Sequence, residues 1–117
     1  MKHIILIEDN ETLQSLIAQF LLDSGYRVTS YPALTSIEEL AAIRADLFII
    51  DERLPSVSGH IICIMLHTNP GTRAIPQILI SGSPMLDRYA ELAEVTASLQ
   101  KPFGMAELLI LVKNVCP

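Results

Sequence analysis

The chain has 117 residues, half of them hydrophobic, and this length and composition favour one globular domain over residues 1–117 with a single core. Its formal net charge of -5 and its singly scattered Lys and Arg residues argue against direct binding of nucleic acid. No apolar run approaches the roughly 18–20 residues that cross a bilayer, and two cysteines do not make a disulfide framework, so we expect a cytoplasmic protein with no membrane segment.

The first two predicted elements are a strand and a helix. Residues 4–7 form a continuous apolar run of strand length, which Glu8, Asp9 and Asn10 follow. Apolar residues then recur at helical spacing, with Asp9 or Asn10 as the N-cap and Gly25 at the stop. The expected buried stripe of this helix consists of Leu13, Leu16, Ile17, Phe20 and Leu21.

The middle of the chain predicts two more strands around a short helix. Residues 27–31 alternate as a short strand, and Ser36 opens a capping-box sequence for a helix that ends at about Arg44. Residues 47–50 are four apolar residues in a row, which is typical of a strand buried on both faces. Asp51 ends this run, so we expect its carboxylate where the strand emerges from the core.

The last part of the chain repeats the same order. Residues 60–67 are predicted to be a helix because they lie between two strand-like runs, although their isoleucines leave a strand open. Residues 77–80 form the fourth strand, and a helix capped by Ser83 runs to about Glu94. A weak fifth strand over 95–100 and a final helix over roughly 105–115 complete the chain.

Strand and helix therefore alternate five times, which predicts an α/β fold with a parallel sheet and helices on both of its faces. Right-handed crossovers leave few topologies for five such units, and the flavodoxin-like strand order 2-1-3-4-5 is the natural one.

Polar residues follow four of the predicted strands at the same edge of this sheet. They are Glu8 and Asp9, Asp51, Ser81, and Lys101. Carboxylates crowded together raise one another's pKa unless a cation intervenes, and Mg²⁺ is the oxygen-seeking cation that fits. A metal, a hydroxyl and an ammonium group around Asp51 suit phosphoryl transfer to that carboxylate. Taken one at a time, these residues also have ordinary structural explanations: Asp9 as a helix cap, Ser81 as a hydroxyl at the end of a strand and Lys101 as a solvated lysine.

These residues stand in four motifs that together resemble one family over essentially the whole chain. The motifs are Ile7-Glu8-Asp9-Asn10, Ile50-Asp51 with Leu54-Pro55 and Gly59, Ser81-Gly82, and Lys101-Pro102-Phe103. The chain resembles a response regulator receiver domain of two-component signalling, the family of the chemotaxis protein CheY.

The resemblance implies a role for each site residue. Asp51 would accept a phosphoryl group from a histidine of a partner kinase or phosphotransfer protein. Asp9, Asp51 and the backbone carbonyl of Arg53 would hold Mg²⁺, and Glu8 would act through a metal-bound water. Ser81 and Lys101 would contact the phosphoryl oxygens. The family also has a cis peptide at the position of Lys101-Pro102, where the tertiary amide makes that isomer accessible.

The sequence departs from the family pattern at two places. The family usually has an aromatic residue three positions before the lysine, where this chain has Ser98. We therefore expect phosphoryl acceptance to survive and the usual coupled aromatic switch to be missing. In addition, Glu94 stands where the family often has a glycine-containing turn, which leaves the end of the fourth helix open.

A partner surface is predicted on the last helix. Ile110 and Leu111 fall off the expected buried stripe, which consists of Met105, Leu108, Leu109 and Val112. Adjacent apolar residues on an outer face can mark an interface. The family uses its fourth helix, fifth strand and fifth helix for homodimers or output targets.

Three functional readings remain at this point. The leading one is a phosphoaspartate signalling module, not an enzyme with a small-molecule product, in which Arg53 and Ser83 tune the slow loss of phosphate. An aspartyl-phosphate phosphatase of the haloacid-dehalogenase type is disfavoured, because such enzymes want an acid at the position of Arg53. The third is a receiver-like binding scaffold. In the leading reading the chain is either a stand-alone protein or a receiver from a larger regulator or hybrid kinase.

Overall fold

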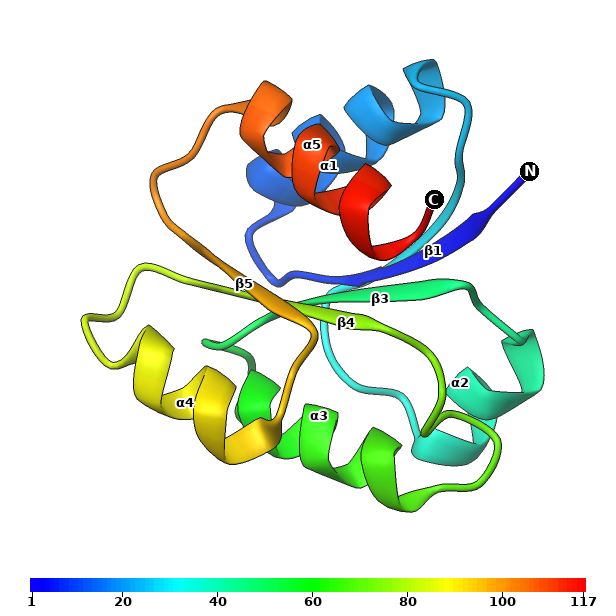
Figure 1. Cartoon of the computed structure of the whole chain (residues 1–117), viewed down its shortest axis with the longest axis vertical. Coiled ribbons are helices and arrows are strands. Elements are labelled where there is room, and N and C mark those ends of the chain that lie inside the picture. The colour runs from blue at the N-terminus through cyan, green and yellow to red at the C-terminus, as the bar shows by residue number, and fades with distance from the viewer.

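The computed structural model describes residues 1–117 as alternating strands and helices (Figure 1). The strands are β1 (His3–Ile7), β2 (Arg27–Tyr31), β3 (Leu47–Asp51), β4 (Gln77–Ser81) and β5 (Ala97–Gln100). The helices are α1 (Glu11–Asp23), α2 (Ile37–Ile43), α3 (Gly59–Thr68), α4 (Leu86–Ala93) and α5 (Met105–Val115). All neighbouring strands are parallel in the order β2-β1-β3-β4-β5, which confirms the predicted fold. Each helix is too short or too polar to cross a lipid bilayer.

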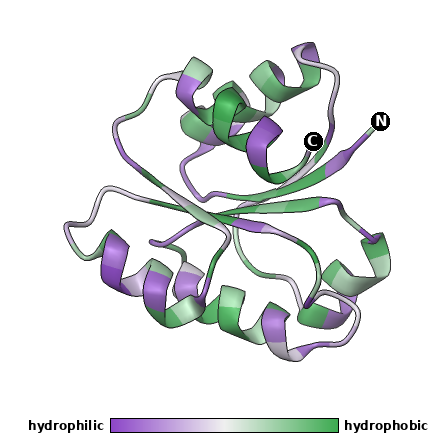
Figure 2. Ribbon diagram, in the orientation of Figure 1, coloured by the Kyte–Doolittle hydropathy of each residue, from purple (hydrophilic) through white to green (hydrophobic).

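The sheet separates two layers of helices. Helices α1 and α5 cover one face, and α2, α3 and α4 cover the other (Figure 1). Successive side chains of a strand point to opposite faces, so Leu47 and Ile49 join the core under α1 and α5, whereas Phe48 and Ile50 join the core against α2, α3 and α4. Figure 2 shows the strands at the centre of the sheet mostly in the hydrophobic colour. Burial on both faces explains why β1, β3 and β4 are nearly continuous apolar runs.

The strand register aligns the carboxyl ends of the strands. Ile7 pairs with Ile50, and Asp51 pairs with Ile80 in the next strand. Ser81 pairs with Gln100, the last residue of β5. The residues that end or follow these strands therefore lie along one edge of the sheet, which is where open α/β sheets form ligand sites.

Two helix starts agree with the sequence and one does not. The side chain of Asn10 accepts a hydrogen bond from Leu13 N at 2.9 Å, and that of Ser36 accepts one from Glu39 N at 3.1 Å. Helix α4 begins at Leu86, later than predicted, because Ser83 heads a separate turn in which its carbonyl accepts from Leu86 N.

The junction between α4 and β5 also differs from the prediction. Glu94 ends α4 with a left-handed φ of 53°, the conformation for which glycine is favoured. The fifth strand is shorter than expected and begins at Ala97, because the Val95 N–H donates to the Ala90 carbonyl in the turn that ends α4.

Two predicted helix stripes need correction. Leu16 of α1 is 57% exposed, since Ile17 and Leu21 bury that helix against the sheet. On α5, Ile110 is 63% exposed as expected, but Leu111 packs against the core together with Leu108 and Val112. Leu111 lies three residues beyond Leu108, so the two share one helix face.

Candidate functional site

A polar cavity of about 330 Å³ lies at the carboxyl edge of the sheet. None of its lining residues is hydrophobic: they are Glu8, Asp9, Asn10, Asp51, Arg53, Ser81, Gly82, Ser83 and Lys101. Every site residue predicted from the sequence is in this set. Parallel strands deliver them from β1, β3 and β4 and from the segment after β5.

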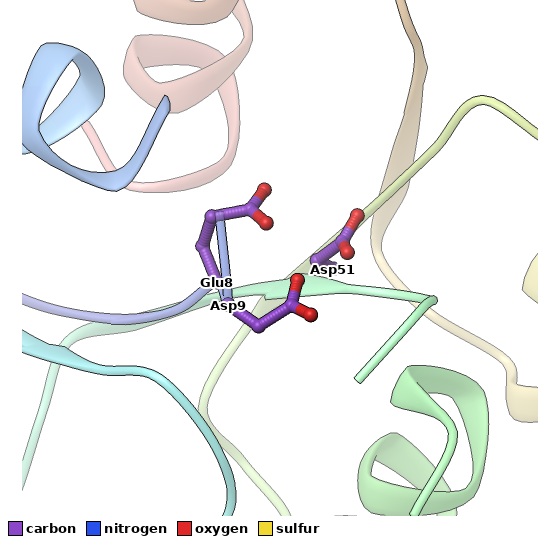
Figure 3. A group of neighbouring side chains, drawn as sticks. All are labelled: Glu8, Asp9 and Asp51. Atoms are coloured by element: carbon purple, nitrogen blue, oxygen red, sulfur yellow. The ribbon is translucent and has the colours of Figure 1, made fainter. Parts of the chain in front are cut away.

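Three carboxylates converge in the cavity. Glu8, Asp9 and Asp51 each offer an oxygen that lies within 4.8 Å of the others. Figure 3 shows Glu8 and Asp9 coming from the segment after β1, and Asp51 from the end of β3. Glu8 and Asp51 are only 1% and 3% exposed, whereas Asp9 is open to solvent. An all-oxygen, highly anionic donor set with one solvent-facing side fits a hard divalent cation such as Mg²⁺.

Lys101 is the cation that the chain itself places among these acids. Its Nζ lies 2.9 Å from Asp51 Oδ1 and 3.2 Å from Glu8 Oε1. Burial alone would lower the pKa of Lys101, but the hydrogen bond and charge of Asp51, with a further contribution from Glu8, raise it. Lys101 is therefore held in its charged form between the two buried carboxylates.

In the carboxyl groups, by contrast, the effect of burial on the pKa outweighs that of the neighbouring charges. Burial raises the pKa of Asp51, and the charge of Asp9 adds to this, although the hydrogen bond and charge of Lys101 oppose it. Burial likewise raises the pKa of Glu8, and the charge of Asp51 adds to it, against opposing contributions from Asn10 and Lys101. With one lysine among three carboxylates, the cluster keeps an excess of negative charge, and this excess favours the binding of a cation.

Glu8 is fixed by residues that the sequence did not identify as a support. The backbone N–H of Asn10 donates to Glu8 Oε2 at 3.1 Å, and Gln14 Nε2 donates to the Glu8 carbonyl at 2.8 Å. Gln14 lies on α1. These bonds fix the turn between β1 and α1, which carries Glu8 and Asp9.

The other side of the cavity is formed by the segment after β4. Ser81 Oγ accepts a hydrogen bond from Ser83 N at 2.9 Å. The carbonyl of Ser81 accepts from Lys101 N at 2.8 Å, so the start of the β5–α5 segment is tied to the end of β4. The Lys101–Pro102 peptide is cis, as the resemblance implied. Ser98 lies in β5 beside Leu79 of β4 and provides no ring near the cavity.

The loop after β3 is anchored close to Asp51. Gly59 N donates to the Glu52 carbonyl at 2.8 Å, and Glu52 N donates to the Ile80 carbonyl at 2.8 Å. A Cβ atom at Gly59 would collide with the backbone carbonyl of Asp51. Glycine at this position lets α3 start directly against the strand that carries the central carboxylate.

Comparisons with known proteins agree with one another. The family profile described as "Response regulator receiver domain" matches residues 4–113. Hybrid signal transduction histidine kinase D of Dictyostelium discoideum is 27% identical over 114 residues, which cover 96% of this chain and 7% of that protein. The uncharacterized transcriptional regulatory protein YvcP of Bacillus subtilis is 31% identical over 123 residues, which cover 98% of this chain and 48% of that protein. The chain thus spans half or less of these relatives.

A solved structure provides the corresponding structural likeness. The receiver domain of sensor histidine kinase PA1611 from Pseudomonas aeruginosa PAO1 is 28% identical, with a TM-score of 0.88. The alignment covers 98% of this chain and 97% of that one. That structure has a magnesium ion coordinated in its active-site cleft.

Proposed function

This chain belongs to the response regulator receiver family of two-component signalling, and on that premise we propose that it is a phosphoacceptor whose Asp51 takes a phosphoryl group from a histidine of a partner kinase or phosphotransfer protein. The observation that carries the proposal is the position of Asp51, buried beside two further acids and 2.9 Å from Lys101 Nζ. The proposed unit is residues 1–117, acting in the cytoplasm, alone or within a larger regulator or hybrid kinase.

Each cavity residue has a proposed part in the transfer. A carboxylate oxygen of Asp51 forms a bond to phosphorus as the phosphorus–nitrogen bond to the donor histidine breaks, and the histidine leaves as the neutral or protonated imidazole. The ammonium group of Lys101 and the hydroxyl of Ser81 stabilise negative charge on the transferring oxygens. Asp9, Asp51 and the carbonyl of Arg53 would hold Mg²⁺, with Glu8 acting through a bound water; when present, the ion supplies further charge neutralisation.

The proposed activity is signalling by a covalent state and not turnover of a small molecule. The acyl phosphate on Asp51 returns to a carboxylate by slow hydrolysis. Arg53 and Ser83 line the same cavity as Asp51 and stand where they can limit the approach of water. We assign them to tuning the lifetime of the phosphorylated protein.

The deciding experiment is an intact-mass measurement after incubation with acetyl phosphate and Mg²⁺. We expect the mass of one phosphoryl group to appear, and to be absent without Mg²⁺ or in Asp51→Asn. A circular dichroism spectrum of the variant controls for folding. No mass gain in a folded wild-type protein with Mg²⁺ would contradict the proposal and favour a binding scaffold that retains the acids.

For partner contacts beyond the phosphodonor, we propose the surface formed by α4, β5 and α5, used for a homodimer or an output target. Its support is the exposure of Leu92 on α4 and Ile110 on α5, which are 58% and 63% exposed. Ile110→Arg is the suitable probe, because Leu111 packs against the core. Light scattering and pull-down yields that match the wild type in Ile110→Arg would count against this surface.

A further inference from the structure

Asp51 has a neighbour on the other side of the sheet. Side chains alternate along β3, and Phe48 and Ile50 pack in the core against α2, α3 and α4. Glu52 continues this alternation, and its side chain is directed toward α3. Glu52 is 8% exposed, and a glutamate is rarely so buried unless its carboxylate is paired. One peptide unit therefore joins a group in the acidic cavity to a buried carboxylate in the opposite layer.

Both carboxylate oxygens of Glu52 are bonded to a single residue, His60. The His60 backbone N–H donates to Oε1 at 2.8 Å, and Nδ1 of the His60 ring donates to Oε2 at 2.7 Å. His60 is the second residue of α3, so Glu52 also satisfies a free N–H at the start of that helix. These two bonds link the residue after Asp51 to α3 through both backbone and side chain.

The His60 ring continues this connection to α4. It stacks on the ring of Tyr89, with ring centroids 4.5 Å apart and planes inclined by 9°. Tyr89 lies in the middle of α4 and is half-buried. Asp51, Glu52, His60 and Tyr89 thus form an unbroken series of covalent, hydrogen-bonded and stacked contacts from the acidic cavity to the fourth helix.

Space for movement lies beside this series. A second cavity of about 220 Å³ is lined by Glu52, Arg53, Leu54, Ser58, Ser81, Ser83 and Tyr89. It shares Arg53, Ser81 and Ser83 with the acidic cavity. Tyr89 therefore borders a cavity that is also lined by Ser81, whose hydroxyl is expected to contact a phosphoryl oxygen.

We propose that Glu52, His60 and Tyr89 couple phosphorylation of Asp51 to the position of α4. In the resting protein Tyr89 is stacked on His60; when the loop after Asp51 rearranges around a phosphoryl group, Glu52 moves His60 and the Tyr89 ring shifts toward the 220 Å³ cavity. This coupling rests on the proposed phosphoacceptor function. It does not need a ring at Ser98, and by linkage a partner bound at α4 would alter phosphorylation in return.

Nuclear magnetic resonance of the tyrosine rings tests the coupling directly, because the chain has three tyrosines and no tryptophan. Beryllofluoride with Mg²⁺ serves as the phosphoryl mimic, and the ¹⁹F signal of the bound mimic reports occupancy of the site independently. We expect the Tyr89 ring signals to shift when the mimic binds, and those of Tyr26, at the opposite edge of the sheet, to remain unchanged.

Variants separate the coupling from the chemistry. In His60→Leu we expect the mimic to bind while the Tyr89 shift is lost, whereas the matched control His67→Leu, near the other end of α3, retains the shift. Glu52→Ala breaks the same connection from the other side. Glu52→Gln can keep both contacts, because its amide oxygen can accept from the His60 backbone N–H while its NH2 group donates to Nδ1 of the other ring tautomer, so we expect it to preserve the coupling. A full Tyr89 shift in folded His60→Leu or Glu52→Ala, or no Tyr89 shift in the wild type with the mimic bound, overturns the coupling. No bound mimic in the wild type overturns the phosphoacceptor function itself.

Discussion

Lys101 Nζ lies 2.9 Å from Asp51 Oδ1, so the proposed phosphoacceptor is already paired with a cation in the resting protein. The same nitrogen is 3.2 Å from Glu8 Oε1. Burial raises the pKa of Asp51, and the hydrogen bond and charge of Lys101 oppose that rise. The same ammonium group lies where it can neutralise charge in the proposed transfer.

Lys101→Met is therefore expected to slow phosphorylation of Asp51 by acetyl phosphate on the order of 100-fold, the usual effect of removing one charge-stabilising group. The time course of the intact-mass gain measures this rate. Lys113→Met, on the exposed side of α5, is the matched control and keeps the wild-type rate. Equal rates in the two variants would exclude Lys101 from the transfer.

Mg²⁺ is expected to stabilise the folded protein, because it binds the acid cluster only when the cluster is assembled. A concentration 100 times the dissociation constant adds about 2.7 kcal/mol to the free energy of unfolding. Thermal unfolding with and without Mg²⁺ measures the gain. Asp9→Asn should lose most of it, while Glu38→Gln, on the exposed face of α2, should keep it. A full gain in Asp9→Asn would remove Asp9 from the ligand set.

The raised pKa of Glu8 predicts how stability depends on pH in the presence of a chelator. Burial, with the charge of Asp51 adding to it, raises this pKa, so the folded protein binds the proton more tightly than the unfolded chain does. The stabilisation from that proton is full below the ordinary pKa of 4.5 and is lost as the pH rises through the raised pKa.

Glu8→Gln carries no such titration. We therefore expect it to be more stable than the wild type at neutral pH, with an advantage that shrinks as the solution is acidified. Urea unfolding of both proteins across the acid to neutral range measures the difference. An advantage that is independent of pH would mean that Glu8 is not the titrating group.

Gly59→Ala is expected to destabilise the fold by about 3 kcal/mol, at the upper end for overpacking. The new Cβ would press against the carbonyl oxygen of Asp51 and lie 2.7 Å from its carbonyl carbon, and neither is on a flexible side chain. Gly104→Ala is the control: its nearest neighbour is Glu107 Oε1 at 3.9 Å. Urea midpoints compare the two variants. A loss no larger at Gly59 than at Gly104 would show that the backbone yields easily there.

Arg53→Ala and Ser83→Ala are expected to change the lifetime of the phosphorylated protein, because both residues line the cavity around Asp51. Removing the long Arg53 side chain from the rim should admit water and speed the loss of phosphate. The decay of the phosphorylated mass after removal of acetyl phosphate measures this. Wild-type decay in both variants would refute the assignment.

The strands and the site were predictable because both depend on simple local patterns. Apolar runs of four residues identify the central strands, and a parallel topology then brings Glu8, Asp51, Ser81 and Lys101 to one edge. The cavity contains each of them. The excess of acidic over basic residues at this edge can also be counted directly from the residues that follow the strands.

Other features depend on how elements approach one another, and the sequence could not reveal them. Helical spacing allows either Leu109 or Leu111 to share the buried face with Leu108 and Val112, and only docking against the sheet packs Leu111 against the core. The bond from Gln14 to Glu8 and the pairing of Glu52 with His60 join segments whose separation along the chain carries no periodic signal. Ser83 heads a separate turn where the sequence predicted a helical cap, because the same local residues suit both structures.

The sheet also makes the protein modular in a way that an engineer can use. Its two cores share no residue, so substitutions in the helices of opposite layers, far from each other, should combine additively in their effects on stability. The outer faces of α3 and α4 can therefore be redesigned to recognise a new partner while the α1–α5 layer is left untouched. A sensor built on this scaffold could be retargeted without rebuilding its chemistry.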